Sequence, residues 1–158
     1  MEKTFTVPIL ESHGFNLWDA ESGEDWDGDW ENDDWGDIDL GVAEGVITVF
    51  TPRGGGDVPV TIAVMPEHEV ELGDWSRVLE CSIAIPSGRV VALDNMDEVV
   101  AEVEVEPGTY RAVIYCGRYE TVEYDSSTGN DHYRAVLAPF SGELEPRVLK
   151  DFEGEYAG

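Results

Sequence analysis

Basic side chains are scarce in this chain of 158 residues. Lys and Arg together number 9, against 35 Asp and Glu, so the formal net charge is -26. Only Lys3 and Lys150 are lysines. Proteins that bind nucleic acids contact the phosphates through clustered Lys and Arg side chains. The composition therefore argues against direct nucleic-acid binding and favours a basic protein as the partner.

Long apolar runs are also absent. No apolar stretch approaches the length of a membrane-spanning helix, which needs about eighteen residues. The N-terminus, MEKTFTVPILESHG, has neither an apolar run of signal-peptide length nor a small-residue cleavage pattern. We therefore expect a cytoplasmic protein with no membrane contact. Its two cysteines, Cys81 and Cys116, lie in apolar runs typical of strands, which favours buried thiols in a reducing compartment over a disulfide.

Catalytic motifs are missing as well. The chain has no GxSxG, GxxxxGK or HExxH pattern, and the three glycines at 54–56 lack the Lys and helix of a phosphate-binding loop. The histidines His13, His68 and His132 stand singly, without the spacing of zinc ligands. Cys116 and His132 can be drawn as nucleophile and base, but Cys116 ends an apolar run, which favours a structural role. We predict a non-catalytic protein without a cofactor.

The chain is rich, instead, in short apolar runs separated by turn residues every eight to twelve positions, which is typical of an all-β protein. Within 98–106 the odd-numbered Val and Ala residues are predicted to face one side and the glutamates the other. Within 78–85 the odd-numbered apolar residues likewise share one face. We expect eight to ten strands and no long helix, with strands at 4–10, 15–18, 45–51, 58–65, 78–85, 89–93, 98–106, 109–116 and 133–137.

Turn residues and strand number together indicate the architecture. Pro86-Ser87-Gly88 predicts a hairpin between 78–85 and 89–93, and Pro107-Gly108 predicts a turn into 109–116. Many half-buried strands need a second sheet to cover their apolar faces. We predict an antiparallel β-sandwich of jelly-roll type, with a closed barrel as the alternative. One domain is expected over 1–140, followed by an acidic, loosely ordered tail at 141–158.

Two arginines are conspicuous in so acidic a chain. Arg111 and Arg134 each lie beside a Tyr in a predicted strand. Facing residues on neighbouring strands form ion pairs when their charges are opposite. We expect both arginines to pair with cross-strand carboxylates such as Glu102 or Glu104.

The most unusual part of the sequence is an acidic insertion near the N-terminus. Eleven of the twenty-one residues in 19–39 are carboxylates, none is basic, and three are Trp. In an extended chain, alternate side chains point to the same side at intervals of about 6.8 Å. The carboxylates of 25, 27, 29, 31 and 33 then form one row, with Trp26 and Trp30 on the other side. Such a row resembles the charges of a nucleic-acid strand and predicts mimicry of DNA toward a basic nuclease cleft.

Other interpretations of this insertion remain open. A helix also places Trp26 and Trp30 on one face, although the glycines of the segment weaken it. A solvated loop is a further alternative. The segment does not match an EF-hand calcium loop, because the sixth position counted from Asp25 is a Trp where Gly is required. The carboxylates within 33–39 are still numerous enough for weak Ca²⁺ binding. Adaptation to a salt-rich cytoplasm explains the acidity without any partner, and predicts acids spread evenly over the surface.

Several short pieces of the sequence resemble one known family. These are 11–19 (ESHGFNLWD), 45–50 (GVITVF), the strand that leads into 86–88 (PSG), and 105–111 (VEPGTYR), which together span most of 11–138. In their order they are similar to the competence protein ComJ family, the small bacterial inhibitors of a DNA-entry nuclease. The resemblance implies a non-catalytic β-sandwich that blocks a basic nuclease by contact. This chain departs from the family in its longer acidic segment and its acidic end after Pro139.

We therefore predict a non-catalytic acidic binding protein, an inhibitor or immunity-like protein that docks on a basic partner such as a nuclease. The alternatives are a β-sandwich module that binds Ca²⁺ or a carbohydrate, and a structural domain whose acidity is salt adaptation. The predicted partner-binding residues are Asp25, Trp26, Asp27, Asp29, Trp30, Glu31, Asp33 and Asp34.

Overall fold

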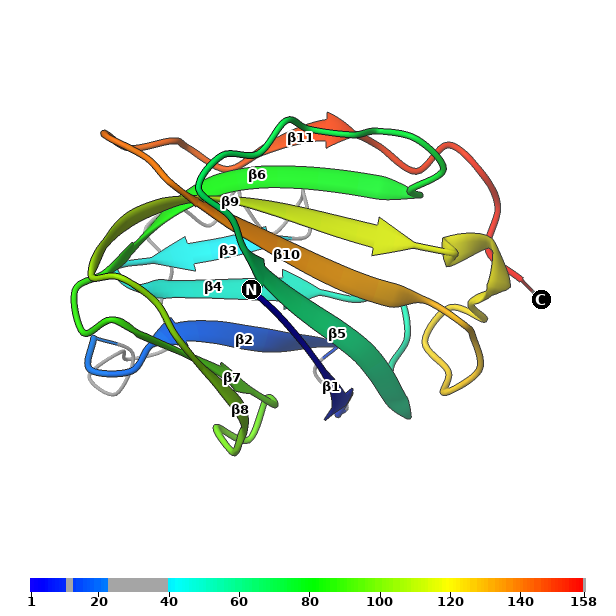
Figure 1. Cartoon of the computed structure of the whole chain (residues 1–158). Helices are drawn as coiled ribbons and strands as arrows, with labels where there is room; N and C mark the ends of the chain where they lie inside the picture. The colour runs from blue at the N-terminus through cyan, green and yellow to red at the C-terminus, as the bar shows by residue number, and fades with distance from the viewer. Residues whose placement is uncertain (11–12, 23–39, 158) are drawn as a thin grey trace.

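Two β-sheets face each other across a hydrophobic core (Figure 1). The computed structural model describes residues 1–10, 13–22 and 40–157. Sheet A has six strands in the order β1 (Glu2–Pro8), β5 (Asp57–Val64), β10 (His132–Pro139), β9 (Gly108–Gly117), β6 (Arg77–Ile85) and β11 (Arg147–Lys150). Sheet B has five strands in the order β3 (Leu40–Ala43), β4 (Val46–Phe50), β2 (Gly14–Asp19), β7 (Arg89–Leu93) and β8 (Val99–Glu104).

The predicted all-β fold is confirmed. Neighbouring strands are antiparallel throughout both sheets except for β5 and β10, which run parallel. The one helical element in the described residues is a single 3₁₀ turn, Tyr119–Thr121. The two sheets remain separate, so the molecule is a sandwich and not a closed barrel.

The strands β6 to β9 form a long hairpin that is folded across both sheets, as in jelly rolls. β6 pairs with β9 in sheet A, and β7 pairs with β8 in sheet B. The chain changes sheets at two corners, 86–88 and 105–107, and the Val105 amide donates to the Gly88 carbonyl at 2.9 Å. The predicted turn at 86–88 is therefore present, but the hairpin predicted there is wrong because β6 and β7 lie in different sheets.

Side chains that alternate along the strands fill the space between the sheets. The odd-numbered apolar residues of 79–85 lie in this core, as predicted, and Phe15, Ile62, Ile114 and Tyr133 join them. A second apolar cluster lies on the outer face of sheet A, where Trp75 and Leu149 pack against it. Sheet A therefore buries apolar side chains on both faces, which explains why several of its strands read as continuous apolar runs.

Two strands and one side-chain direction were missed in the sequence. β3 and β11 have only four residues each, too few for a clear alternating pattern. Val99 is 54% exposed instead of buried, because a register shift between Ala92 and Leu93 breaks the alternation at the start of β8. Ala101 and Val103 face the core as predicted.

The end of the chain contributes to sheet A. β11 lies within the segment predicted as a tail and pairs with β6, so that it forms one edge of the sheet. The following residues continue in the direction of β11 to the end of the sandwich that holds the loop after β9 (Figure 1), where the Ala157 amide donates to the Val122 carbonyl at 2.8 Å. The domain boundary at 140 and the loose order of the tail stay predictions.

Both cysteines are buried free thiols, as the sequence indicated. They lie in the core between the sheets on different strands, β6 and β9. Burial, with a smaller contribution from the neighbouring Glu80 carboxylate, raises the pKa of Cys81 to about 12. This thiol is therefore protonated and unreactive at neutral pH.

Candidate functional site

The predicted partner-binding residues, at 25–27, 29–31 and 33–34, lie outside the described residues. The structure does describe the strands on either side of this insertion. β2 ends at Asp19 and β3 begins at Leu40, and both strands pair with β4. Trp18 lies opposite Val46 at the start of β4, whereas Leu40 lies opposite Val49 near its end. The insertion therefore joins two points at opposite ends of one short strand of sheet B.

The first carboxylate of the acidic segment, Asp19, has a structural role. It is buried, and it accepts hydrogen bonds from the amide and hydroxyl of Ser87 at 3.0 and 2.5 Å and from the Ser22 amide at 2.9 Å. Burial acts to raise the pKa of Asp19, but these hydrogen bonds outweigh it and hold the pKa below its usual range. Asp19 thus ties the start of the insertion to the corner between β6 and β7.

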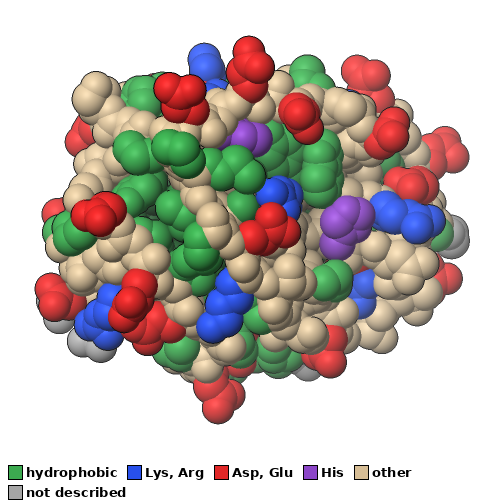
Figure 2. All heavy atoms as spheres, in the orientation of Figure 1, with side chains coloured by type: hydrophobic (Ala, Val, Ile, Leu, Met, Phe, Trp, Pro, Cys, Tyr) green, Lys and Arg blue, Asp and Glu red, His purple; other side chains and the backbone are tan. Residues whose placement is uncertain are grey.

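Acidic residues are not confined to the insertion. Twenty-five of the thirty-five carboxylates belong to the described residues, and four of these are buried: Asp19, Glu80, Asp94 and Asp131. Figure 2 shows acidic side chains around the margin of the viewed face, with Arg, Lys and His also near its centre. The scaffold therefore carries negative charge by itself. A wide spread of acids is also what the salt-adaptation alternative predicts.

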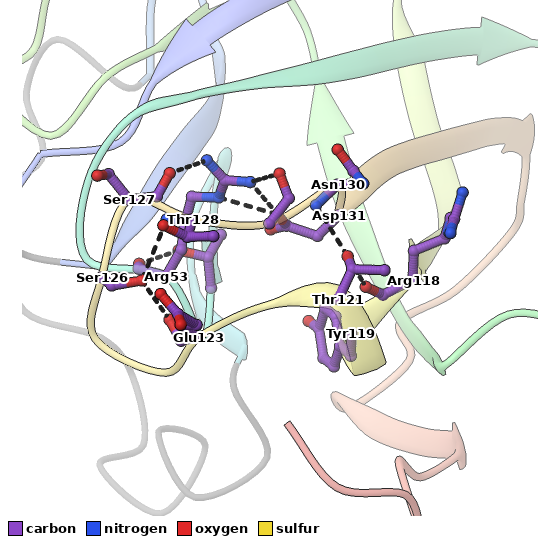
Figure 3. A network of polar contacts seen from close by, with 12 residues as sticks. Arg53, Arg118, Tyr119, Thr121, Glu123, Ser126, Ser127, Thr128, Asn130 and Asp131 are labelled. Carbon is purple, nitrogen blue, oxygen red and sulfur yellow. Dashed lines mark hydrogen bonds and ion pairs between the residues drawn. The ribbon is translucent and has the colours of Figure 1, made fainter. Parts of the chain in front are cut away.

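A buried ion pair organises the loops at one end of the sandwich (Figure 3). Arg53 donates to Asp131 Oδ1 from Nε at 2.9 Å and from Nη2 at 2.5 Å, and both side chains are almost fully buried. The same guanidinium donates to the carbonyls of Ser127 and Gly129 at 3.1 and 2.7 Å. The second oxygen of Asp131 accepts from the Tyr133 hydroxyl at 2.5 Å. Each charged group is therefore hydrogen-bonded, as buried charges require.

Local hydrogen bonds complete the loop between β9 and β10, residues 118–131. The Thr121 hydroxyl donates to the Arg118 carbonyl at 2.7 Å and accepts from the Asn130 amide at 2.8 Å. The Ser126 hydroxyl donates to the Glu123 carbonyl at 2.8 Å. With the Arg53 bonds, these contacts fix the backbone of a loop in which Glu120, Glu123, Tyr124 and Asp125 are exposed, whereas Tyr119 and Asp131 are buried. No local pattern in the sequence indicates this arrangement, because Arg53 and Asp131 are 78 residues apart.

A second cluster of charges lies on the outer face of sheet A. The buried Glu80 carboxylate accepts from Arg111 on β9 and from Arg147 on β11, the latter at 2.7 Å from Nε. Arg134 instead pairs with Glu2 at 3.2 Å. Both arginines expected to pair with Glu102 or Glu104 therefore have cross-strand carboxylate partners, but the predicted partners were wrong, because β8 lies in the opposite sheet. The Glu80 cluster borders a cavity of about 420 Å³.

His68 lies beside this cavity. Its Nε2 is 2.5 Å from the Tyr115 hydroxyl, which also accepts from the Glu71 amide at 3.2 Å. Burial, and then the nearby Arg111 guanidinium, lower the pKa of His68. The imidazole is therefore neutral at pH 7 and joins the loop 65–76 to the sheet.

The described residues do not assemble a catalytic centre from the pair considered in the sequence. Cys116 points into the core between the sheets, whereas the ring of His132, on the adjacent strand, packs against Trp75 on the outer face. The two side chains are therefore on opposite faces of sheet A. Within the described ranges, no three His, Cys, Asp or Glu side chains come together as a metal-binding group. In the same ranges, no helix has the length and apolar character needed to cross a membrane.

Comparison with known proteins places this fold. No protein-family profile matches the chain. ComJ from Bacillus subtilis, an inhibitor of the DNA-degrading activity of NucA, superposes with a TM-score of 0.64 at 11% sequence identity, over 89% of this chain and 96% of ComJ. The crocagin biosynthetic gene J product superposes with a TM-score of 0.56 at 20% identity, over 88% of this chain and 98% of the other. The chain therefore has a ComJ-like fold.

One curated protein shares a short stretch of sequence with this chain. The bifunctional protein FolD of Lactiplantibacillus plantarum is 44% identical over 45 residues, which are 28% of this chain and 16% of FolD. The chain thus spans about one-sixth of the length of the curated relative that it matches. A match this short does not support assigning the activity of FolD to this chain.

Proposed function

We propose that this chain is a non-catalytic inhibitor or immunity-like protein that docks on a basic protein, and that its target is a nuclease. The observation that supports this function best is the ComJ-like fold, since ComJ inhibits the DNA-degrading activity of NucA. The strong negative charge of the chain agrees with it, because the cleft of a nuclease is built to hold phosphates. Opposite charges also accelerate the encounter of two proteins.

The contact row assigned to this function consists of the acidic residues of the insertion, Asp25, Asp27, Asp29, Glu31, Asp33 and Asp34, with Trp26 and Trp30 as anchors. Carboxylates on alternate positions can occupy the phosphate sites of a nuclease cleft, and buried Trp side chains often dominate binding energies at interfaces. The strands before and after the insertion, β2 and β3, both lie in sheet B, which supports presentation of the row from this sheet.

The test is capture of the partner from the organism's own cell extract. The immobilised chain is incubated with extract at about 50 mM and about 500 mM salt, and the retained proteins are identified and assayed for DNA degradation. We expect a basic nuclease that is retained at low salt, released at high salt and inhibited by the free chain. Retention of no basic protein at either salt concentration would contradict the proposal.

A pair of variants distinguishes binding through the contact row from binding that depends only on the total negative charge. In the first, Asp25, Asp27 and Asp29 are changed to Asn and Glu31 to Gln. In the control, four exposed glutamates along β8 and its ends are changed to Gln: Glu98, Glu102, Glu104 and Glu106. Both variants lose four charges. We expect the first to lose binding to the captured nuclease and the control to retain it; equal binding by both would reject the row.

Salt adaptation is the competing function class, and the spread of acids over the described surface favours it. It predicts that the two variants behave alike, with equal changes in the salt dependence of thermal unfolding, and that no partner is retained. The capture experiment therefore distinguishes a binding protein from a protein that is only adapted to salt.

A further inference from the structure

Four aromatic rings form a continuous row from the core to the surface. They belong to the loop that follows β9 and to the C-terminal segment, whose backbones lie at the same end of the sandwich (Figure 1). The Tyr119 ring centroid is 5.5 Å from that of Phe152, which is 5.1 Å from Tyr156, which is 5.4 Å from Tyr124. Tyr119 is buried, Tyr156 is 36% exposed and Tyr124 is 64% exposed. We name these four residues the aromatic row. Its two outer residues, Tyr124 and Tyr156, are therefore accessible to solvent.

The two segments that carry the aromatic row are acidic. The two segments that carry the rings, 119–125 and 151–157, contain no Lys or Arg. Two of their acids, Glu120 and Asp151, lie within 4 Å of an arginine from elsewhere, at 3.8 and 3.6 Å. The exposed acids closest in sequence to Tyr124 and Tyr156 are Glu123, Asp125, Glu153 and Glu155. Each segment therefore carries three carboxylates and no basic residue, and we call these six acids the frame of carboxylates.

The backbone under this surface is fixed. The Arg53 and Asp131 ion pair and the local bonds of Figure 3 hold the loop 118–131. The C-terminal segment joins the loop through the bridge between Glu123 and Ala157. A rigid surface loses little conformational entropy when it binds.

One more contact at this surface carries backbone strain. His13 and Asp125 both have left-handed backbones, with φ of 59° and 61°, and His13 Nε2 lies 2.7 Å from Asp125 Oδ1. Gly54 lies beside this pair, where a Cβ atom would come within 2.8 Å of the Asp125 carboxylate. Non-glycine residues adopt such backbones at a cost and concentrate at binding sites.

We infer that the aromatic row and its frame of carboxylates bind an arginine-rich segment of the basic partner. A guanidinium group is flat, so it stacks on a tyrosine face while its N–H groups reach a carboxylate beside the ring. Tyr124 and Tyr156 supply the faces, and Glu123, Asp125 and Glu155 lie next to them in sequence. This inference rests on the proposed function and adds to it a second contact region, on the rigid scaffold and separate in sequence from the insertion.

The test uses peptides of defined composition and the full chain. A peptide of alternating Arg and Gly with ten arginines is titrated into ¹⁵N-labelled protein, and the Lys counterpart of equal charge serves as a comparison. We expect the largest amide shifts within 118–125 and 151–157, with tighter binding of the Arg peptide. Shifts confined to 19–40, or no binding of the Arg peptide, would overturn the inference.

Variants of one exposed ring make the test specific. Tyr124→Ala is expected to weaken binding of the Arg peptide about five- to tenfold, whereas Tyr124→Phe keeps the ring and binds like the parent chain. Met96→Ala removes another exposed apolar side chain, 76% exposed, from a different loop and is expected to change nothing. Circular dichroism confirms that each variant is folded. Equal binding by Tyr124→Ala and the parent chain would overturn the inference.

The outcomes also separate this inference from the proposed function. The captured nuclease is tested against the variant of the contact row and against Tyr124→Ala. If it no longer binds the first but still binds the second, only the inference about the aromatic row is contradicted. Failure to capture any basic protein contradicts the proposed function, whatever the peptide titration shows.

Discussion

At the scale of single residues, the fold depends on a few carboxylates that are removed from water. Asp19, Glu80 and Asp131 are buried, and each accepts hydrogen bonds from partners that are far away in the sequence. Each of them fixes one junction: the corner between β6 and β7, the edge strand β11, and the loop 118–131. In a chain of this composition the few buried acids have specific structural partners, and the many exposed ones are available for other roles.

Asp131→Ala is expected to lower the free energy of unfolding by about 3–5 kcal/mol, because it leaves the buried Arg53 guanidinium without its counter-charge. Glu102→Ala removes an exposed pair with Arg89, in which both side chains are nearly half exposed, and is expected to cost less than about 1 kcal/mol. Urea denaturation of both variants measures the difference. Equal losses would contradict the role given to the buried pair.

His68 makes stability depend on pH. Its pKa is lowered in the folded chain from 6.5, so below about pH 6.5 the unfolded chain binds a proton that the folded chain does not. Stability from this group is therefore complete above pH 6.5 and is lost as the pH falls toward the folded pKa. We expect His68→Gln to flatten the dependence of the free energy of unfolding between pH 7.5 and 5.5. An unchanged slope would show that another group is responsible.

At the scale of elements, the alternation of apolar and polar residues predicted most strands, because one face of each strand packs against the core between the sheets. The same alternation does not predict which strands are neighbours in a sheet. The two tight turns at 86–88 and 105–108 connect strands in different sheets, and nothing local distinguishes such a corner from a hairpin. The structure shows what differs: the corner at 86–88 is held by Asp19 of a third strand and by the Val105 amide.

The corner also predicts a specific mutational effect. Gly88 has a φ of 73°, and a Cβ atom there would lie 3.0 Å from the Val105 carbonyl oxygen. Gly88→Ala is therefore expected to destabilise the fold by about 1–2 kcal/mol. Gly55→Ala is the matched control, since its nearest neighbour would be 3.6 Å away and its φ is not in the left-handed region. Thermal unfolding of both variants tests this, and equal melting temperatures would contradict it.

At the scale of the whole molecule, charge repulsion is the dominant electrostatic term. With a net charge of -26, the folded chain gathers carboxylates that the unfolded chain keeps farther apart. We expect the melting temperature to rise by several degrees between about 0.05 and 1 M NaCl, because salt screens this repulsion. Differential scanning calorimetry over this range tests the expectation. A melting temperature that stays constant or falls would show that repulsion does not limit stability.

The candidate site could be predicted only in part. The enrichment of acids in 19–39 and the resemblance to the ComJ family are both visible in the sequence. The architecture implied by that resemblance is confirmed by the ComJ-like fold. The contact row itself lies outside the described residues and stays a prediction. The aromatic row was invisible in the sequence because Tyr119 and Tyr124 meet Phe152 and Tyr156 only when β9 and the C-terminal segment are folded together.

The parallel pairing of β5 with β10 has a consequence for biosynthesis. Val60 lies opposite Tyr133, and among the strands that the structure describes β10 alone joins β1 and β5 to the rest of sheet A. The ribosome must therefore release the chain through β10 before β5 acquires its inner neighbour. Until then an apolar strand has an open flank, so nascent or truncated chains that stop before residue 132 are expected to need a chaperone or to self-associate.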